Sequence, residues 1–176
     1  MIVERRKTKE LSRLALARFA NQAQRATGLR GEVNILLTGD AEMQRLNMQF
    51  RHKDKPTDVL SFPHAPAAGS AALSASAPAA GSAALSDSAA GGDIAISMAA
   101  ARVQAAALGH DLLTEVKVLI LHGMLHLAGH DHERDHGEML RLEQKLREEL
   151  HLSAGLIERT MTRQRTGGPA ARTRRP

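Results

Sequence analysis

Two thirds of the way along the chain the sequence reads Val116-Lys117-Val118-Leu119-Ile120-Leu121-His122-Gly123-Met124-Leu125-His126-Leu127. Before its first histidine this run carries a single charge, on Lys117, and is otherwise apolar. Such a pattern predicts a buried helix, which we place at Leu112–Leu127. A helix that is apolar on almost every side must be covered by other elements, so it is expected to lie at the centre of the fold.

Three histidines follow the apolar run with the spacing H-x3-H-x5-H: His122, His126 and His132. The first two are four residues apart, so they share one face of the helix. Gly129 can adopt the left-handed conformation that ends a helix, which lets the chain fold back and present His132. Three neutral imidazoles suit one divalent metal and leave a coordination position for water, as in catalytic rather than structural sites. Zn²⁺, one per chain, is the first choice because the chain has no Cys, although nickel, copper or iron would also fit nitrogen ligands.

Two neighbours of the third histidine are candidates for supporting the ligands. Asp131 is expected to accept the second N–H of a ligating imidazole. For His130 three roles stay open: contact with a ligand, contact with a substrate, or simple exposure.

The histidine spacing is shared with the metalloprotease signature H-E-x-x-H-x-x-G-x-x-H, in which the Glu is the general base. This chain has Gly123 at that position, and glycine cannot accept a proton. A peptidase built on this site would need another base, such as Asp131, Glu133 or Asp135. A zinc metallopeptidase is therefore an alternative, as is a non-enzymatic protein with a structural metal.

A basic segment lies upstream, where Arg51, Lys53 and Lys55 follow a helix predicted at Asp40–Phe50 and precede a strand predicted at Thr57–Phe62. If this loop faces the metal, the guanidinium of Arg51 suits a phosphate oxygen, with the two lysines as point charges. A hydrolase with that clamp would cut phosphodiesters rather than peptides. The alternative is a solvated charged loop.

These segments together resemble the YbeY family of bacterial metal-dependent endoribonucleases, which act in ribosomal RNA maturation. The resemblance extends from about Val33 to Leu150 and is carried by residues 122–132, by Phe50-Arg51 with Pro56-Thr57-Asp58-Val59-Leu60-Ser61-Phe62-Pro63, and by Gly92-Asp93-Ile94-Ala95-Ile96-Ser97. The chain departs from the family at His130, where the family often has Tyr, and in a long Ala/Ser-rich tract.

The resemblance implies that His122, His126 and His132 bind the metal and that Arg51 is the basic residue needed for RNA cleavage. It further implies a single-stranded RNA substrate, 3′-end maturation of small-subunit ribosomal RNA and ribosome quality control. Ribosomal RNA and the small ribosomal subunit would then be the partners, with no DNA and no membrane. If the metal is only structural, the alternative is a non-enzymatic ribosome-assembly factor.

Composition limits how such a protein would hold RNA. Residues 1–60 carry 12 basic and 7 acidic residues, residues 61–157 carry 6 and 11, and residues 158–176 carry 6 and 1. Attraction to a polyanion is therefore expected from the first and last segments. Aromatic residues make up 2% of the chain, with no Trp or Tyr, so stacking of bases on aromatic side chains is not expected. The lack of Cys, of a long apolar run and of a signal-like start predicts a soluble protein of the cytoplasm.

The remaining periodicities predict an α+β fold with about five helices around a small sheet, which the resemblance implies to be mixed, and a metal site on the central buried helix. One metal-hydrolase domain would span residues 1–157, with a low-complexity loop at about 64–91 and a disordered Arg-rich tail at 158–176. The resemblance implies about four strands, the extra one from Ile2 to Arg6. The other predicted elements are helices at Glu10–Ala26, Ala99–Leu108 and Glu133–Leu150 and strands at Glu32–Thr38 and Asp93–Met98.

Overall fold

The computed structural model describes residues 2–4, 11–64, 91–132 and 134–152. Its elements run in the order β1 (Ile2–Glu4), α1 (Arg13–Ala26), β2 (Val33–Thr38), α2 (Asp40–Arg51), β3 (Val59–Pro63), β4 (Gly92–Ser97), α3 (Met98–Leu108), α4 (Leu112–Leu127) and α5 (Glu138–Glu149). The predicted α+β class, with its small mixed sheet and helices, is confirmed.

The four strands form one sheet in the order β1-β2-β4-β3. β1 and β4 both run parallel to β2, whereas β3 runs antiparallel to β4 and forms an edge of the sheet. The pairing of Pro63 with Gly92 brings the end of β3 next to the start of β4.

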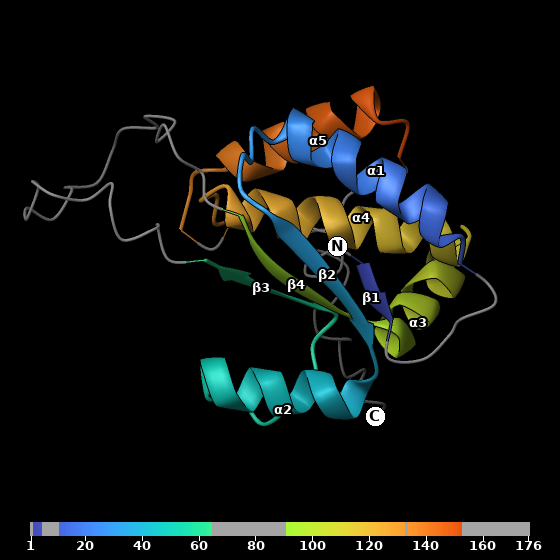
Figure 1. The fold of residues 1–176 in the computed structure, drawn as a ribbon, viewed down its shortest axis with the longest axis vertical. Helices are drawn as coiled ribbons and strands as arrows, with labels where there is room; N and C mark the ends of the chain where they lie inside the picture. The colour runs from blue at the N-terminus through green and yellow to red at the C-terminus, as the bar shows by residue number, and fades with distance from the viewer. Residues whose placement is uncertain (1, 5–10, 65–90, 133, 153–176) are drawn as a thin grey trace, which may run out of the picture.

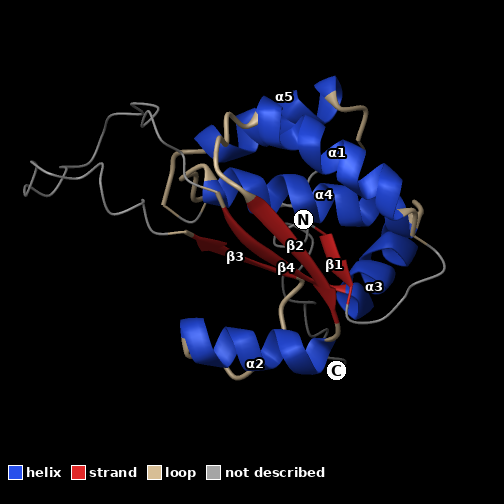
Figure 2. Ribbon diagram, viewed as in Figure 1, coloured by secondary structure: helices blue, strands red, loops and turns tan. Residues whose placement is uncertain are grey.

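The sheet is covered on both faces (Figure 1). α4 lies across one face, with α1 and α5 packed outside it, and α2 is the described helix that lies across the other (Figure 2). The alternation of side chains in β4 matches this division, because Ile94 and Ile96 join the core around α4 while Ala95 packs with Met43 of α2. The central, buried position predicted for α4 is confirmed, and its single lysine, Lys117, reaches the surface over the ring of Phe19.

Several element boundaries differ from the predictions because side chains bond the backbone there. The first helix begins at Arg13 rather than Glu10, since the Ser12 hydroxyl accepts a hydrogen bond from the Ala15 amide. The strand expected from Thr57 begins at Val59, whose amide donates to the Asp58 carboxylate. α2 begins at Asp40, as predicted, and ends at Arg51, one residue later than predicted. Its N-cap residue is Gly39, and the Asp40 carboxylate accepts the hydroxyl of Ser97.

The closing helix was placed at Glu133 and in fact begins at Glu138. Asp135 explains the late start: its two carboxylate oxygens accept the amides of Gly137 and Met139, at 2.8 and 2.7 Å. These bonds hold a turn ahead of α5.

Parts of some predictions lie outside the described residues: the loop at 64–91 beyond His64 and before Gly91, the tail at 158–176, and the extension of β1 to Arg6. Among the helices that the structure describes, none is long and apolar enough to cross a bilayer.

Candidate metal centre

The C-terminal end of α4 turns back on itself at Gly129, as predicted. Gly129 has a φ of +93°, and its amide donates to the carbonyl of His126 at 3.0 Å. The next amide, of His130, donates to the carbonyl of Leu125 at 3.1 Å. These two bonds form a Schellman motif, which satisfies the last carbonyls of the helix and reverses the chain. The reversal brings His132 back beside α4.

The three histidines converge. One ligand atom from each of His122, His126 and His132 lies within 4.8 Å of the others, and the Nε2 atoms of His122 and His126 are 3.1 Å apart. Two nitrogens bound to one tetrahedral zinc at about 2.0–2.1 Å would be separated by roughly 3.3 Å. The arrangement therefore fits a single metal ion with three nitrogen ligands.

The protonation of His126 also suits a metal. Burial, together with the neighbouring His122 and His132, lowers the pKa of His126 from its ordinary 6.5 to about 4. A hydrogen bond with the backbone of His130 and the charge of Asp131 act in the opposite direction. At neutral pH the imidazole of His126 is neutral, which is the form that binds metals.

A buried carboxylate from another helix supports the first ligand. Nδ1 of His122 lies 3.2 Å from Oε2 of Glu143 on α5, and Glu143 is 1% exposed. Because a carboxylate accepts, Nδ1 carries the hydrogen and Nε2 is left free to bind a metal. Sequence reasoning missed Glu143 and chose Asp131 and His130. The structure places both of these near His126, Asp131 through its charge and His130 through its backbone.

Gly123 faces the sheet and not the histidines. A Cβ built there would lie 2.9 Å from Cγ2 of Ile94 and 3.1 Å from Oγ of Ser61. The Ser61 hydroxyl donates to the Gly123 carbonyl at 3.1 Å. The position that carries the general base in the protease signature is thus taken up by close packing of α4 on the sheet.

The basic loop lies across the sheet from the histidines. Arg51 is the last residue of α2, on the face opposite α4 (Figure 1). Both sites lie at the same end of the sheet, since Phe50 contacts Phe62 of β3 while Leu127 of α4 meets Gly92. The edge strand β3 therefore runs between the Arg51 loop and the histidine cluster.

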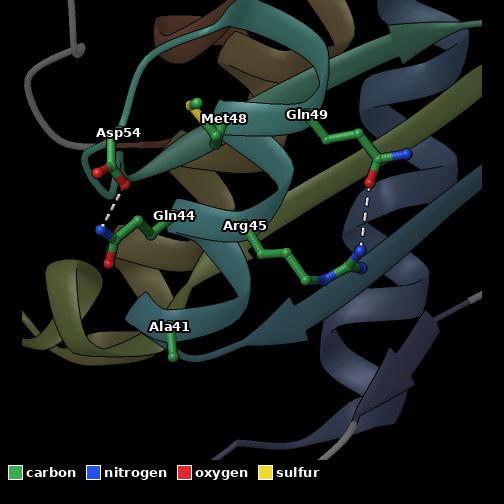
Figure 3. Close-up of a pocket in the computed structure, with 6 residues that line it drawn as sticks. All are labelled: Ala41, Gln44, Arg45, Met48, Gln49 and Asp54. Carbon is green, nitrogen blue, oxygen red and sulfur yellow. Dashed lines mark hydrogen bonds between the residues drawn. The ribbon is translucent and has the colours of Figure 1, made fainter.

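This loop is held by specific bonds, unlike a loosely solvated segment. The buried amide of Asn47 donates to the carbonyl of Lys55 at 2.7 Å. Gln44 donates to the carboxylate of Asp54 at 2.8 Å, which folds the loop back along α2 beside an open hollow of about 460 Å³ (Figure 3). Arg51, Lys53 and Lys55 themselves are exposed. The loop thus presents its cations from a fixed backbone.

This protein combines an α+β fold with a three-histidine cluster at the end of its central helix, which is the arrangement expected of a metal-dependent hydrolase. The sequence profile of the family described as Endoribonuclease YbeY matches residues 2–151. The chain belongs to the YbeY family, as the resemblance predicted.

The sequences of known relatives match most of this chain. It is 47% identical over 160 residues to "Endoribonuclease YbeY" of Koribacter versatilis, covering 91% of each chain, and 43% identical over 158 residues to that of Solibacter usitatus, covering 90% and 92%. The solution structure of TM1509 from Thermotoga maritima matches with a TM-score of 0.51 and 23% identity, over 99% of this chain and 100% of that one. The last comparison bears on the fold alone.

Proposed function

We propose that this protein is a metal-dependent endoribonuclease that hydrolyses single-stranded RNA, with one Zn²⁺ per chain. The observation that carries the proposal is the convergence of His122, His126 and His132, in a chain whose relatives are named endoribonucleases. By family, its work would be ribosomal RNA processing in the cytoplasm, including 3′-end maturation of small-subunit RNA and ribosome quality control. Ribosomal RNA and the small subunit would be its partners.

The site residues then take distinct roles. His122, His126 and His132 hold the ion, and Glu143, His130 and Asp131 orient their rings. A divalent ion held by these three histidines would supply Lewis acidity and a bound water with a pKa of about 7. Arg51 binds the phosphate backbone and stabilises the charge that develops during cleavage, while Lys53 and Lys55 bind flanking phosphates. Because β3 separates the loop from the histidines, an RNA that touches both must pass around this edge of the sheet.

The same three histidines support a metallopeptidase function less well, because Gly123 packs against Ile94 and leaves no room for a general base at that position. A direct test offers casein and labelled single-stranded RNA side by side, with and without a chelator. RNA should be cut, casein should stay intact, and the chelator should stop cleavage. Cleavage of casein alone would favour the peptidase, and RNA binding without turnover would favour a non-enzymatic assembly factor.

Arg51 provides the sharpest single substitution. Removing one cation that stabilises developing charge costs a few kcal/mol of barrier, so Arg51→Ala should slow RNA cleavage by roughly 100-fold while metal content stays at the parent level. Arg25→Ala is the matched control, since Arg25 is an exposed arginine in the last turn of α1. His126→Ala should instead lose the metal. Cleavage by Arg51→Ala at the parent rate would remove Arg51 from the mechanism.

A further inference from the structure

Two of the three phenylalanines in the chain lie against each other on the surface. The rings of Phe50 and Phe62 have their centroids 4.9 Å apart, at an angle of 59°. The third, Phe19, is 4% exposed and belongs to the core. The low aromatic content argued against base stacking, but it did not show that most of the aromatic residues gather at one place.

The two rings differ in burial. Phe62 packs against the small cluster formed by Met43, Leu60 and Ala95 between α2 and the sheet, which fixes its position. Phe50 is 55% exposed, so it rests on Phe62 with much of its surface in solvent. An aromatic residue that rests on a fixed support and keeps much of its surface in solvent can act as a stacking platform.

The positive charges beside Phe50 and Phe62 indicate which class of ligand this surface binds. Arg51 follows Phe50 directly, and Lys53 and Lys55 follow in the same anchored loop. A flat apolar surface beside several cations is complementary to a nucleotide, which has an aromatic base attached to an anionic phosphate. A peptide side chain would use the ring and leave the cations without partners.

We propose that Phe50, supported by Phe62, stacks one base of a single-stranded RNA whose phosphate backbone is bound by the Arg51 loop. This inference rests on the proposed function and names a binding site for it. Stacking on an aromatic face tolerates every base, so the site contributes affinity without sequence preference. Bases inside a duplex are already stacked and paired, so the platform selects single strands.

Phe50 has a second possible role, which is to cover the small hydrophobic cluster under α2 as a lid. A lid affects the stability of the protein and has no contact with a ligand. The two roles are separated by Phe50→Leu, which keeps an apolar lid and removes the aromatic face, and by Phe50→Trp, which enlarges that face.

The lack of Trp and Tyr in the chain makes Phe50→Trp a direct reporter. In the full-length, metal-loaded protein, mixing with a short oligouridylate should quench the Trp fluorescence before any turnover. An oligomer of abasic ribose phosphates of equal length should bind through its phosphates and leave the emission unchanged. Leu14→Trp is the control, because Leu14 is exposed on α1, on the other side of the molecule.

Affinity gives a second readout. Loss of one stacked base should make oligouridylate bind about 5-fold to about 100-fold more weakly to Phe50→Leu, while Phe50→Trp keeps the parent affinity and both variants unfold at the parent temperature. Equal affinities for Phe50→Leu and the parent, or no quench in Phe50→Trp, would overturn the platform even if the parent protein cuts RNA. A parent protein that neither binds nor cuts RNA would overturn the proposed function and the platform together.

Discussion

His122 is engaged through both nitrogens of its ring. Nε2 faces His126 across 3.1 Å, and Nδ1 faces Glu143 across 3.2 Å. His122 and Glu143 are both buried, so neither side chain can turn to water without cost. The carboxylate therefore fixes the ring in the orientation and tautomer that a metal requires.

Glu143→Ala should weaken metal binding by about 10-fold to 100-fold, the usual effect of losing a partner behind a metal ligand. Glu143→Gln should have a smaller effect, because its amide oxygen still accepts from Nδ1. Competition with a chelating dye measures the affinity, and Glu148→Ala, an exposed change on the same helix, is the control. A parental Kd in Glu143→Ala would contradict this role.

The low pKa of His126 makes the metal-free protein sensitive to acid. Between pH 6.5 and about 4 the unfolded chain protonates this imidazole while the folded protein does not. Since the unfolded state then binds more protons, the free energy of unfolding falls as the pH is lowered through this window, and it is fully retained above it.

Urea unfolding of chelator-treated protein at several pH values tests this expectation. The carboxylates also titrate at the acidic end, so the informative quantity is the difference between the parent and His126→Asn. That variant should show a weaker loss of stability between pH 6.5 and 4. Parallel curves for the two proteins would argue against a buried neutral imidazole.

At the scale of elements, the sequence predicts those features that depend on residues close together in the chain. The bounds of α4 are those predicted, because the apolar run is flanked by a side-chain cap at Asp111 and by Gly129. The histidine cluster was also predictable, since helical spacing and one reversal bring its members together within a short stretch. Glu143 lies 21 residues from His122 and enters only when α5 packs on α4. On α5 it shares the buried face with Met139 and Leu146, but that spacing does not reveal its partner.

The orientation of the Arg51 loop could not be predicted for a similar reason. Composition gives the charge of a loop, but only the sheet order places α2 and α4 on opposite faces. The predicted start of α5 is too early because the Asp135 carboxylate accepts the amides of Gly137, just before the helix, and Met139, in its first turn. In each case a contact between side chain and backbone, or between distant helices, overrode the local pattern.

Packing of α4 on the sheet depends on the missing side chain at Gly123. Gly123→Ala would place a methyl group 2.9 Å from Cγ2 of Ile94, a branched position close to the backbone. Overpacking costs about 1–3 kcal/mol, and the better helix propensity of alanine offsets up to about 1 kcal/mol. The free energy of unfolding should fall by about 1–2 kcal/mol in chemical denaturation. Gly39→Ala, where the added Cβ meets open space, should change it less, because only the N-cap preference for glycine is lost there.

At the scale of the whole molecule, the proposed RNA contacts make binding depend on salt. Each phosphate neutralised in a single strand contributes about 0.7 to the slope of log affinity against log salt. Lys53→Gln should reduce that slope by about 0.7 and weaken binding alike for all sequences, as measured by fluorescence anisotropy. Lys145→Gln on α5 is the control, because it lies on the far side of the sheet from the loop. An unchanged slope in Lys53→Gln would exclude a phosphate contact there.

The meeting of β3 and β4 has a consequence for protein engineering. Pro63 pairs with Gly92, and the amide of His64 donates to the carbonyl of Gly91 at 3.0 Å, so the chain leaves and re-enters the sheet at neighbouring points. The entropic cost of closing a loop between two such points rises by only about 0.6 kcal/mol for each doubling of the loop length. Guest peptides, tags or reporter modules can therefore be grafted between His64 and Gly91 at little thermodynamic cost, because the sheet already holds the two flanking ends together.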